Sequence, residues 1–123
     1  EGIEKRYQPT ALITFPSATD QTFHHDAGVP GVYSCISAIT HRNLLIRASD
    51  HKDRVDVVSL DPGDVILFNG QHCHAGAGMS RFAQSASVGV HFYLGDNLDP
   101  EATANVYGDQ CEKEQTCHYP AVI

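Results

Sequence analysis

The stretch RVDVVSLDPGDVILFNG, residues 54–70, decides the fold because it holds two apolar runs separated by a tight turn. Residues 54–60 are rich in valine, as is typical of a strand, and four consecutive apolar residues follow at 65–68. Between the runs, Pro62 presets φ for the first central position of a type II turn, and Gly63 tolerates the positive φ of the second. The stretch predicts two strands joined antiparallel.

The same kind of pattern covers most of the chain, and no segment has a sustained helical apolar period. Seven or eight short strands bounded by turn residues predict an all-β domain, either a sandwich or a barrel-like jelly roll. After Leu94 the pattern gives way to an irregular tail with at most a short helix near 99–106. The expected strands are 10–15, 21–26, 32–39, 43–49, 54–60, 64–70 and 86–94.

The length of 123 residues predicts one domain with one modest core. We expect residues 1–95 to form this core and residues 96–123 to pack as a tail on the core or on a partner. The opening EGIEKRYQPT lacks an initiator methionine and a signal-peptide core, which indicates a processed product or a piece of a longer chain. The sequence leaves open whether the chain is part of an oligomer.

Composition argues against two classes of partner. Fifteen acidic residues against eight Lys and Arg give a net charge of −7, with no basic cluster for a nucleic-acid backbone. The apolar runs are too short for a membrane-spanning helix. We therefore expect neither nucleic acid nor membrane as a partner.

The cysteines leave the compartment open. Cys111 and Cys117 bracket the polar segment CEKEQTC and would form a small disulfide loop in an extracellular or virion-like setting, or stay reduced in the cytoplasm. Cys73 is expected to pack as a hydrophobe.

Two polar segments could together hold a metal. In QTFHHDAG, residues 21–28, alternation along a strand puts His24 and Asp26 on one face. A facial triad for non-haem iron(II) needs two histidines and one carboxylate, so this segment supplies two of the three ligands. In GQHCHAGAG, residues 70–78, we choose His74 as the third because small residues follow it, and His72 is its rival.

These residues resemble a known family. Gln21, His24 and Asp26 in a Gln-x-x-His-x-Asp pattern, followed by GDVILFNGQHCHAG and then an arginine, look like the double-stranded β-helix core of iron(II)/2-oxoglutarate-dependent dioxygenases. The resemblance runs from about Thr10 to Leu94. It implies iron(II) held by the three ligands chosen above, with Arg81 binding the distal carboxylate of 2-oxoglutarate. Tyr33, on the expected strand 32–39, is a further candidate for the co-substrate pocket.

The activity implied by this resemblance is hydroxylation of a C–H bond in a small-molecule or peptide substrate, with release of succinate and CO2. Two alternatives remain. GDVILFNGQHCH also resembles the second cupin motif, although Asp26 stands where a cupin normally has a second histidine. The other alternative is a non-catalytic jelly-roll binding or structural module of a larger assembly.

Overall fold

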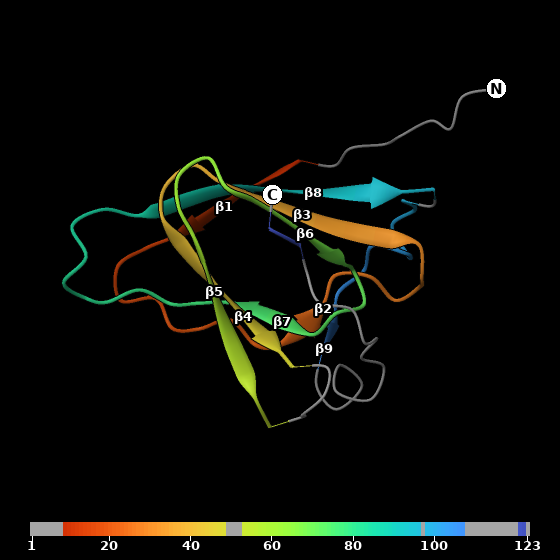
Figure 1. Cartoon of the computed structure of the whole chain (residues 1–123), viewed down its shortest axis with the longest axis horizontal. Helices are drawn as coiled ribbons and strands as arrows, with labels where there is room; N and C mark the ends of the chain where they lie inside the picture. Colours follow the sequence, from red (N-terminus) through yellow and green to blue (C-terminus); the bar gives the residue numbers. More distant parts are fainter. Residues whose placement is uncertain (1–8, 49–52, 97, 108–120, 123) are drawn as a thin grey trace.

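The chain forms an all-β domain of two five-stranded antiparallel sheets (Figure 1). The computed structural model describes residues 9–48, 53–96, 98–107 and 121–122, and none of these residues is helical. No described segment is therefore a helix that could cross a bilayer. The strands are β1 (Thr10–Thr14), β2 (His24–His25), β3 (Val32–Ala38), β4 (Arg42–Arg47), β5 (Val55–Leu60), β6 (Val65–Asn69), β7 (His74–Gly76), β8 (Ser87–Gly95), β9 (Val106–Tyr107) and β10 (Ala121–Val122).

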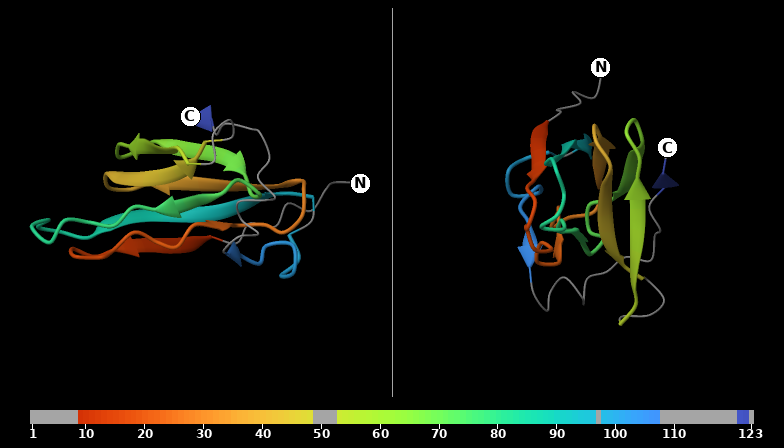
Figure 2. Two further views of the ribbon diagram at one scale, coloured as in Figure 1. Left: turned by 90° about the horizontal axis from the view of Figure 1, so that it is seen from below. Right: turned by 90° about the vertical axis from the view of Figure 1, so that its left-hand side faces the viewer.

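The two sheets face each other across a shared core. Sheet A has the order β1-β8-β3-β6-β10, and sheet B has the order β5-β4-β7-β2-β9. Sheet A occupies the upper part of Figure 1, and most of sheet B occupies the lower part. The axes of the long strands of both sheets are roughly aligned (Figure 2). Inward-facing side chains from both sheets form the main apolar cluster, which contains Ile36, Ala38, Leu44, Ile46, Leu60, Ile66 and Phe68.

A second apolar cluster joins the beginning of the tail to the core. Leu98 and Ala102 are buried against Ala27, Val32 and Tyr93. Residues 100–103 form turns in the segment where the sequence allowed at most a short helix, and β9 then pairs with β2. The part of the tail that the structure describes therefore packs on the core.

The turn at 61–64 has the predicted conformation. Gly63 has φ +93°, and the Asp64 amide donates to the Asp61 carbonyl at 2.9 Å, as in a type II turn. The expectation that this turn pairs its flanking strands is wrong, because β5 lies in sheet B and β6 in sheet A. The Gly63 amide donates to the Ala38 carbonyl at the end of β3, which ties the turn to sheet A.

Each of the seven expected strands overlaps an observed strand, with bounds that differ mostly by one or two residues. The largest difference is at 21–26, where only His24–His25 is a strand. The sequence pattern did not predict β7, β9 and β10. These strands are two or three residues long, which is too short for an alternating pattern to be visible.

Candidate metal centre

His24 and His74 are direct neighbours across two paired strands. They stand opposite each other in the β2–β7 ladder, and their ring centroids lie 4.5 Å apart. Both side chains are buried, and Phe68 packs edge-on against the His74 ring at 4.6 Å. The register of sheet B thus brings together two histidines that are fifty residues apart.

Backbone carbonyls fix the orientation of both rings. Nδ1 of His24 donates to the Thr22 carbonyl and Nδ1 of His74 donates to the His72 carbonyl, each at 2.8 Å. Nε2 of each ring then points at Asp26: His24 Nε2 lies 3.3 Å from Oδ1, and His74 Nε2 lies 3.2 Å from Oδ2. A carbonyl bound to one ring nitrogen is the usual way in which proteins prepare the other nitrogen for a metal.

The donor atoms fit a metal ion. His24, Asp26 and His74 each offer one ligand atom, and these atoms all lie within 4.8 Å of one another. Because Nδ1 carries the ring proton, Nε2 of a neutral histidine presents a lone pair to a carboxylate oxygen. Two acceptors at this distance repel each other unless a proton or a metal ion lies between them. Two imidazole nitrogens and one carboxylate oxygen suit iron(II) and similar divalent ions.

The charge state of the cluster reflects this arrangement. Burial tends to lower the pKa of His24, but hydrogen bonds to Asp26 and Thr22 and the charge of Asp26 raise it above 6.5. Burial tends to raise the pKa of Asp26, yet His74 and hydrogen bonds from three histidines hold it well below 3.8. Asp26 is therefore ionised at neutral pH, and His24 holds a proton more strongly than a free histidine.

These shifts predict a pH dependence for the metal-free protein. The raised pKa of His24 adds stability that is fully present below pH 6.5. This stability is lost as the pH rises through the pKa that His24 has in the folded protein. The lowered pKa of Asp26 adds stability that is fully present above pH 3.8. This stability is lost only as the pH falls toward the pKa that Asp26 has in the folded protein. Urea unfolding should therefore show a lower free energy of unfolding at about pH 8.5 than at about pH 6. His24→Gln should reduce this difference, and an unchanged difference in the variant would contradict the assignment.

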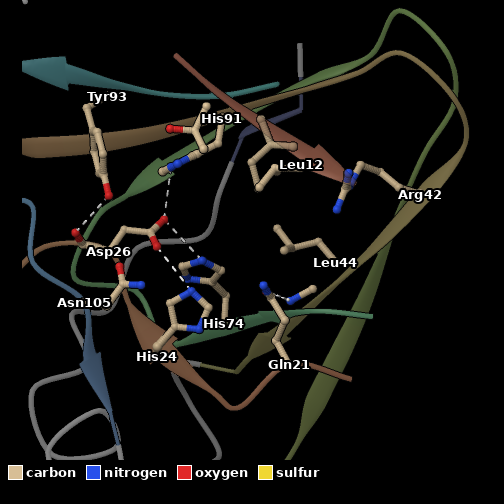
Figure 3. Close-up of a pocket in the computed structure, with 13 residues that line it drawn as sticks. Leu12, Gln21, His24, Asp26, Arg42, Leu44, His74, His91, Tyr93 and Asn105 are labelled. Atoms are coloured by element: carbon tan, nitrogen blue, oxygen red, sulfur yellow. Dashed lines mark hydrogen bonds and ion pairs between the residues drawn. The ribbon is translucent and has the colours of Figure 1, made fainter. Parts of the chain in front are cut away.

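The cluster lies at one end of a pocket of about 260 Å³ between the sheets (Figure 3). Leu12 and Leu44 line the middle of the pocket, and Arg42 lines the other end. Arg42 Nη1 is buried and has no hydrogen-bond partner among the described residues. Burial lowers the pKa of Arg42. The pocket therefore has, at the end opposite the His-Asp-His cluster, a guanidinium nitrogen that no described residue pairs with.

A glycine makes room for this arginine. Gly89 on β8 lies under Arg42, and a Cβ atom at position 89 would approach Arg42 Nη1 to 2.8 Å. The same Cβ would lie 3.0 Å from the Ser37 carbonyl oxygen, so the backbone leaves little space on the other side. The position of the guanidinium thus depends on the absence of a side chain at 89.

The structure brings three of the predicted site residues together and separates the others. His24, Asp26 and His74 form the cluster. The rival His72 is fully buried and lies outside it, with Nε2 at 2.9 Å from the Arg47 carbonyl oxygen. Arg81 is exposed in the loop between β7 and β8, where its guanidinium stacks on Phe82, and it does not line the pocket.

Tyr33 also points away from the pocket. Its side chain is 44% exposed, because residues 32, 34, 36 and 38 of β3 face inward and Tyr33 has the opposite parity. The sequence reasoning missed Arg42, Ser34 and His91. Parity could have indicated Arg42, because it shares a strand face with the apolar residues Leu44 and Ile46.

The cysteines lie outside the cluster. Cys73, expected to pack as a hydrophobe, is fully buried and disulfide-bonded. Cys35 is a buried free thiol, and burial raises its pKa. Cys111 and Cys117, the predicted disulfide pair, lie outside the described residues.

No protein-family model matches the chain, and no curated protein matches it. Solved structures that resemble it in fold include two with a TM-score of 0.60 each. Peruvianin-I, a cysteine peptidase from Thevetia peruviana latex, is 12% identical over 83% of this chain and 55% of its own. AviO1 from Streptomyces viridochromogenes Tue57 is 17% identical over 81% of this chain and 56% of its own. The chain thus spans little more than half of each neighbour, and the likeness shows the fold alone.

Proposed function

We propose that the chain is the core of an iron(II)- and 2-oxoglutarate-dependent oxygenase that hydroxylates a C–H bond of a small-molecule or peptide substrate. One observation carries the proposal: the same pocket is lined by a His-Asp-His cluster and by Arg42, whose buried Nη1 has no hydrogen-bond partner among the described residues. An oxo acid that binds a metal at one end and presents a carboxylate at the other has the chemistry to meet both groups.

The strand order supports a double-stranded β-helix, or jelly roll. The chain changes sheet at every connection from β1 to β8 except the one between β4 and β5. Without the short strands β10 and β9, the sheets have the orders β1-β8-β3-β6 and β5-β4-β7-β2, which is a double-sheet arrangement of eight strands. The proposed metal ligands lie between the sheets at one end.

The residues of the cluster have separate roles. His24 and His74 bind the metal through Nε2, and Asp26 supplies one negative charge to a divalent ion. When bound, iron(II) and 2-oxoglutarate supply oxidative decarboxylation to succinate and CO2, coupled to hydroxylation of the substrate. The protein's own contribution is to orient the ligands and to keep them in a buried setting that limits water.

Arg42 takes the role that the family resemblance had implied for Arg81. Arg81 lies on an exposed loop, whereas Arg42 lines the pocket and its Nη1 atom is buried there. A buried guanidinium nitrogen without a partner is costly, and a carboxylate on the planar guanidinium fork would remove most of this cost through two parallel hydrogen bonds. We therefore assign the distal carboxylate of 2-oxoglutarate to Arg42.

Gly89→Ala should weaken 2-oxoglutarate binding without removing a charged group. The added methyl would push Arg42 Nη1 from its position, since the two atoms would otherwise lie 2.8 Å apart. We expect a roughly 10-fold increase in the Kd for 2-oxoglutarate, with metal affinity unchanged, because a displaced guanidinium loses part of a charged hydrogen bond. Isothermal titration of the metal-free chain with metal gives the metal affinity, and titration of the metal-loaded chain gives the Kd for 2-oxoglutarate. Val88→Ala, one residue earlier with opposite parity, is the matched control.

The first test is an anaerobic titration of the whole chain with iron(II), followed by 2-oxoglutarate, monitored at the weak visible charge-transfer band. We expect the band only when both are present, and iron-dependent formation of succinate on admission of air. Iron binding without a response to 2-oxoglutarate would favour a cupin-type metalloprotein. A chain that binds no iron would be a jelly-roll binding or structural module, and the proposal would fail.

A further inference from the structure

The Asp26 carboxylate has two partners in addition to the histidines of the cluster. Ser34 Oγ donates to Oδ2 at 2.6 Å, and His91 Nε2 lies 3.3 Å from the same oxygen. Ser34 lies on β3 and His91 on β8, so both approach Asp26 from sheet A, opposite the histidines of sheet B (Figure 3). The oxygen Oδ1 faces His24.

We propose that Ser34 and His91 are positioning residues that hold Oδ2 of Asp26 and thereby make Asp26 bind the metal through Oδ1 alone. The inference rests on the proposed metal site and names how that site limits its own coordination number. A carboxylate that bound through both oxygens would occupy one further position on the metal. Holding one oxygen leaves that position open for a ligand such as an oxo acid.

Both donors are rigidly placed. Ser34 is fully buried, and its Oγ lies 3.3 Å from His91 Nε2, so the two groups and Oδ2 form one compact network. The His91 ring packs edge-on against Tyr93 with centroids 4.7 Å apart. In the β3–β8 ladder Ser34 stands opposite Tyr93, so the register places Ser34 beside this pair of rings. Donors on two central strands cannot easily follow the carboxylate if it turns.

The test uses cobalt(II) alone, without oxo acid, because its visible spectrum reports coordination number. Ser34→Ala and His91→Leu should each lower cobalt affinity about 10- to 100-fold, the range for loss of an outer hydrogen bond to a ligand. Both should also weaken the visible bands, since a freed carboxylate adds a second oxygen ligand. His91→Gln should retain most of the affinity and the wild-type spectrum, because its amide N–H donates in place of the ring. His41→Gln, on an exposed loop, is the control.

Three results are decisive. Wild-type affinity and spectrum in both Ser34→Ala and His91→Leu would overturn the inference. An equal loss of cobalt affinity in His91→Gln and His91→Leu would also overturn the inference, because His91 would then act as a metal ligand. A wild-type chain that binds no cobalt would instead refute the metal site on which the proposed function depends. Urea unfolding of each metal-free variant shows whether the fold is intact.

Discussion

Asp26→Ala is expected to lower iron(II) affinity by at least about 100-fold while the domain remains folded, since loss of a ligand costs more than loss of an outer contact. Removal of the carboxylate takes away the only negatively charged ligand of the cluster. It also leaves two imidazole nitrogens, which hold a divalent ion weakly without a third group. The fold should persist because Asp26 lines the pocket, where water can replace its oxygens.

Equilibrium dialysis of the variant against iron(II) under anaerobic conditions, with metal content measured by mass spectrometry, gives the affinity. Asp56→Ala is the matched control, because it removes a half-exposed aspartate of β5 whose carboxylate pairs with Arg54, away from the cluster. Unchanged iron stoichiometry in Asp26→Ala would refute the metal centre. Loss of the urea transition would show that the variant failed to fold, and Asp26→Asn, which keeps the volume, would then replace it.

Arg42→Gln is expected to raise the Kd for 2-oxoglutarate by about 10- to 100-fold, because charged hydrogen bonds to the carboxylate are lost. Iron affinity should stay within about twofold, since Arg42 lies at the other end of the pocket from the cluster. Arg42→Lys should recover only part of the binding, because an ammonium group keeps the charge but lacks the planar fork.

Arg81→Ala provides the comparison for this experiment. Arg81 is exposed and does not line the pocket, so its removal should leave the 2-oxoglutarate affinity unchanged. The opposite result, a loss of 2-oxoglutarate affinity in Arg81→Ala and none in Arg42→Gln, would show that Arg81 binds the distal carboxylate. Titration of the iron-loaded variants at the charge-transfer band separates the two outcomes.

Two of the three proposed metal ligands could be predicted from local sequence alone. His24 and Asp26 are two residues apart on a strand, so alternation alone places them on one face. His72 and His74 have the same spacing, and parity cannot choose between them. The choice depends on β7, which begins at His74 and pairs this residue with His24, whereas His72 precedes the strand. A three-residue strand leaves no pattern from which such pairing could be predicted.

The sequence by itself determined the all-β class, the positions of the longer strands and the type II turn, because alternation and turn chemistry act between neighbouring residues. Only the tertiary structure decided that β5 and β6 belong to different sheets, that Arg42 and His91 line the same pocket as the cluster, and that Ser34 reaches Asp26. These side chains come from strands far apart in the chain. Their meeting depends on sheet order and register, which are set by burial of the whole core.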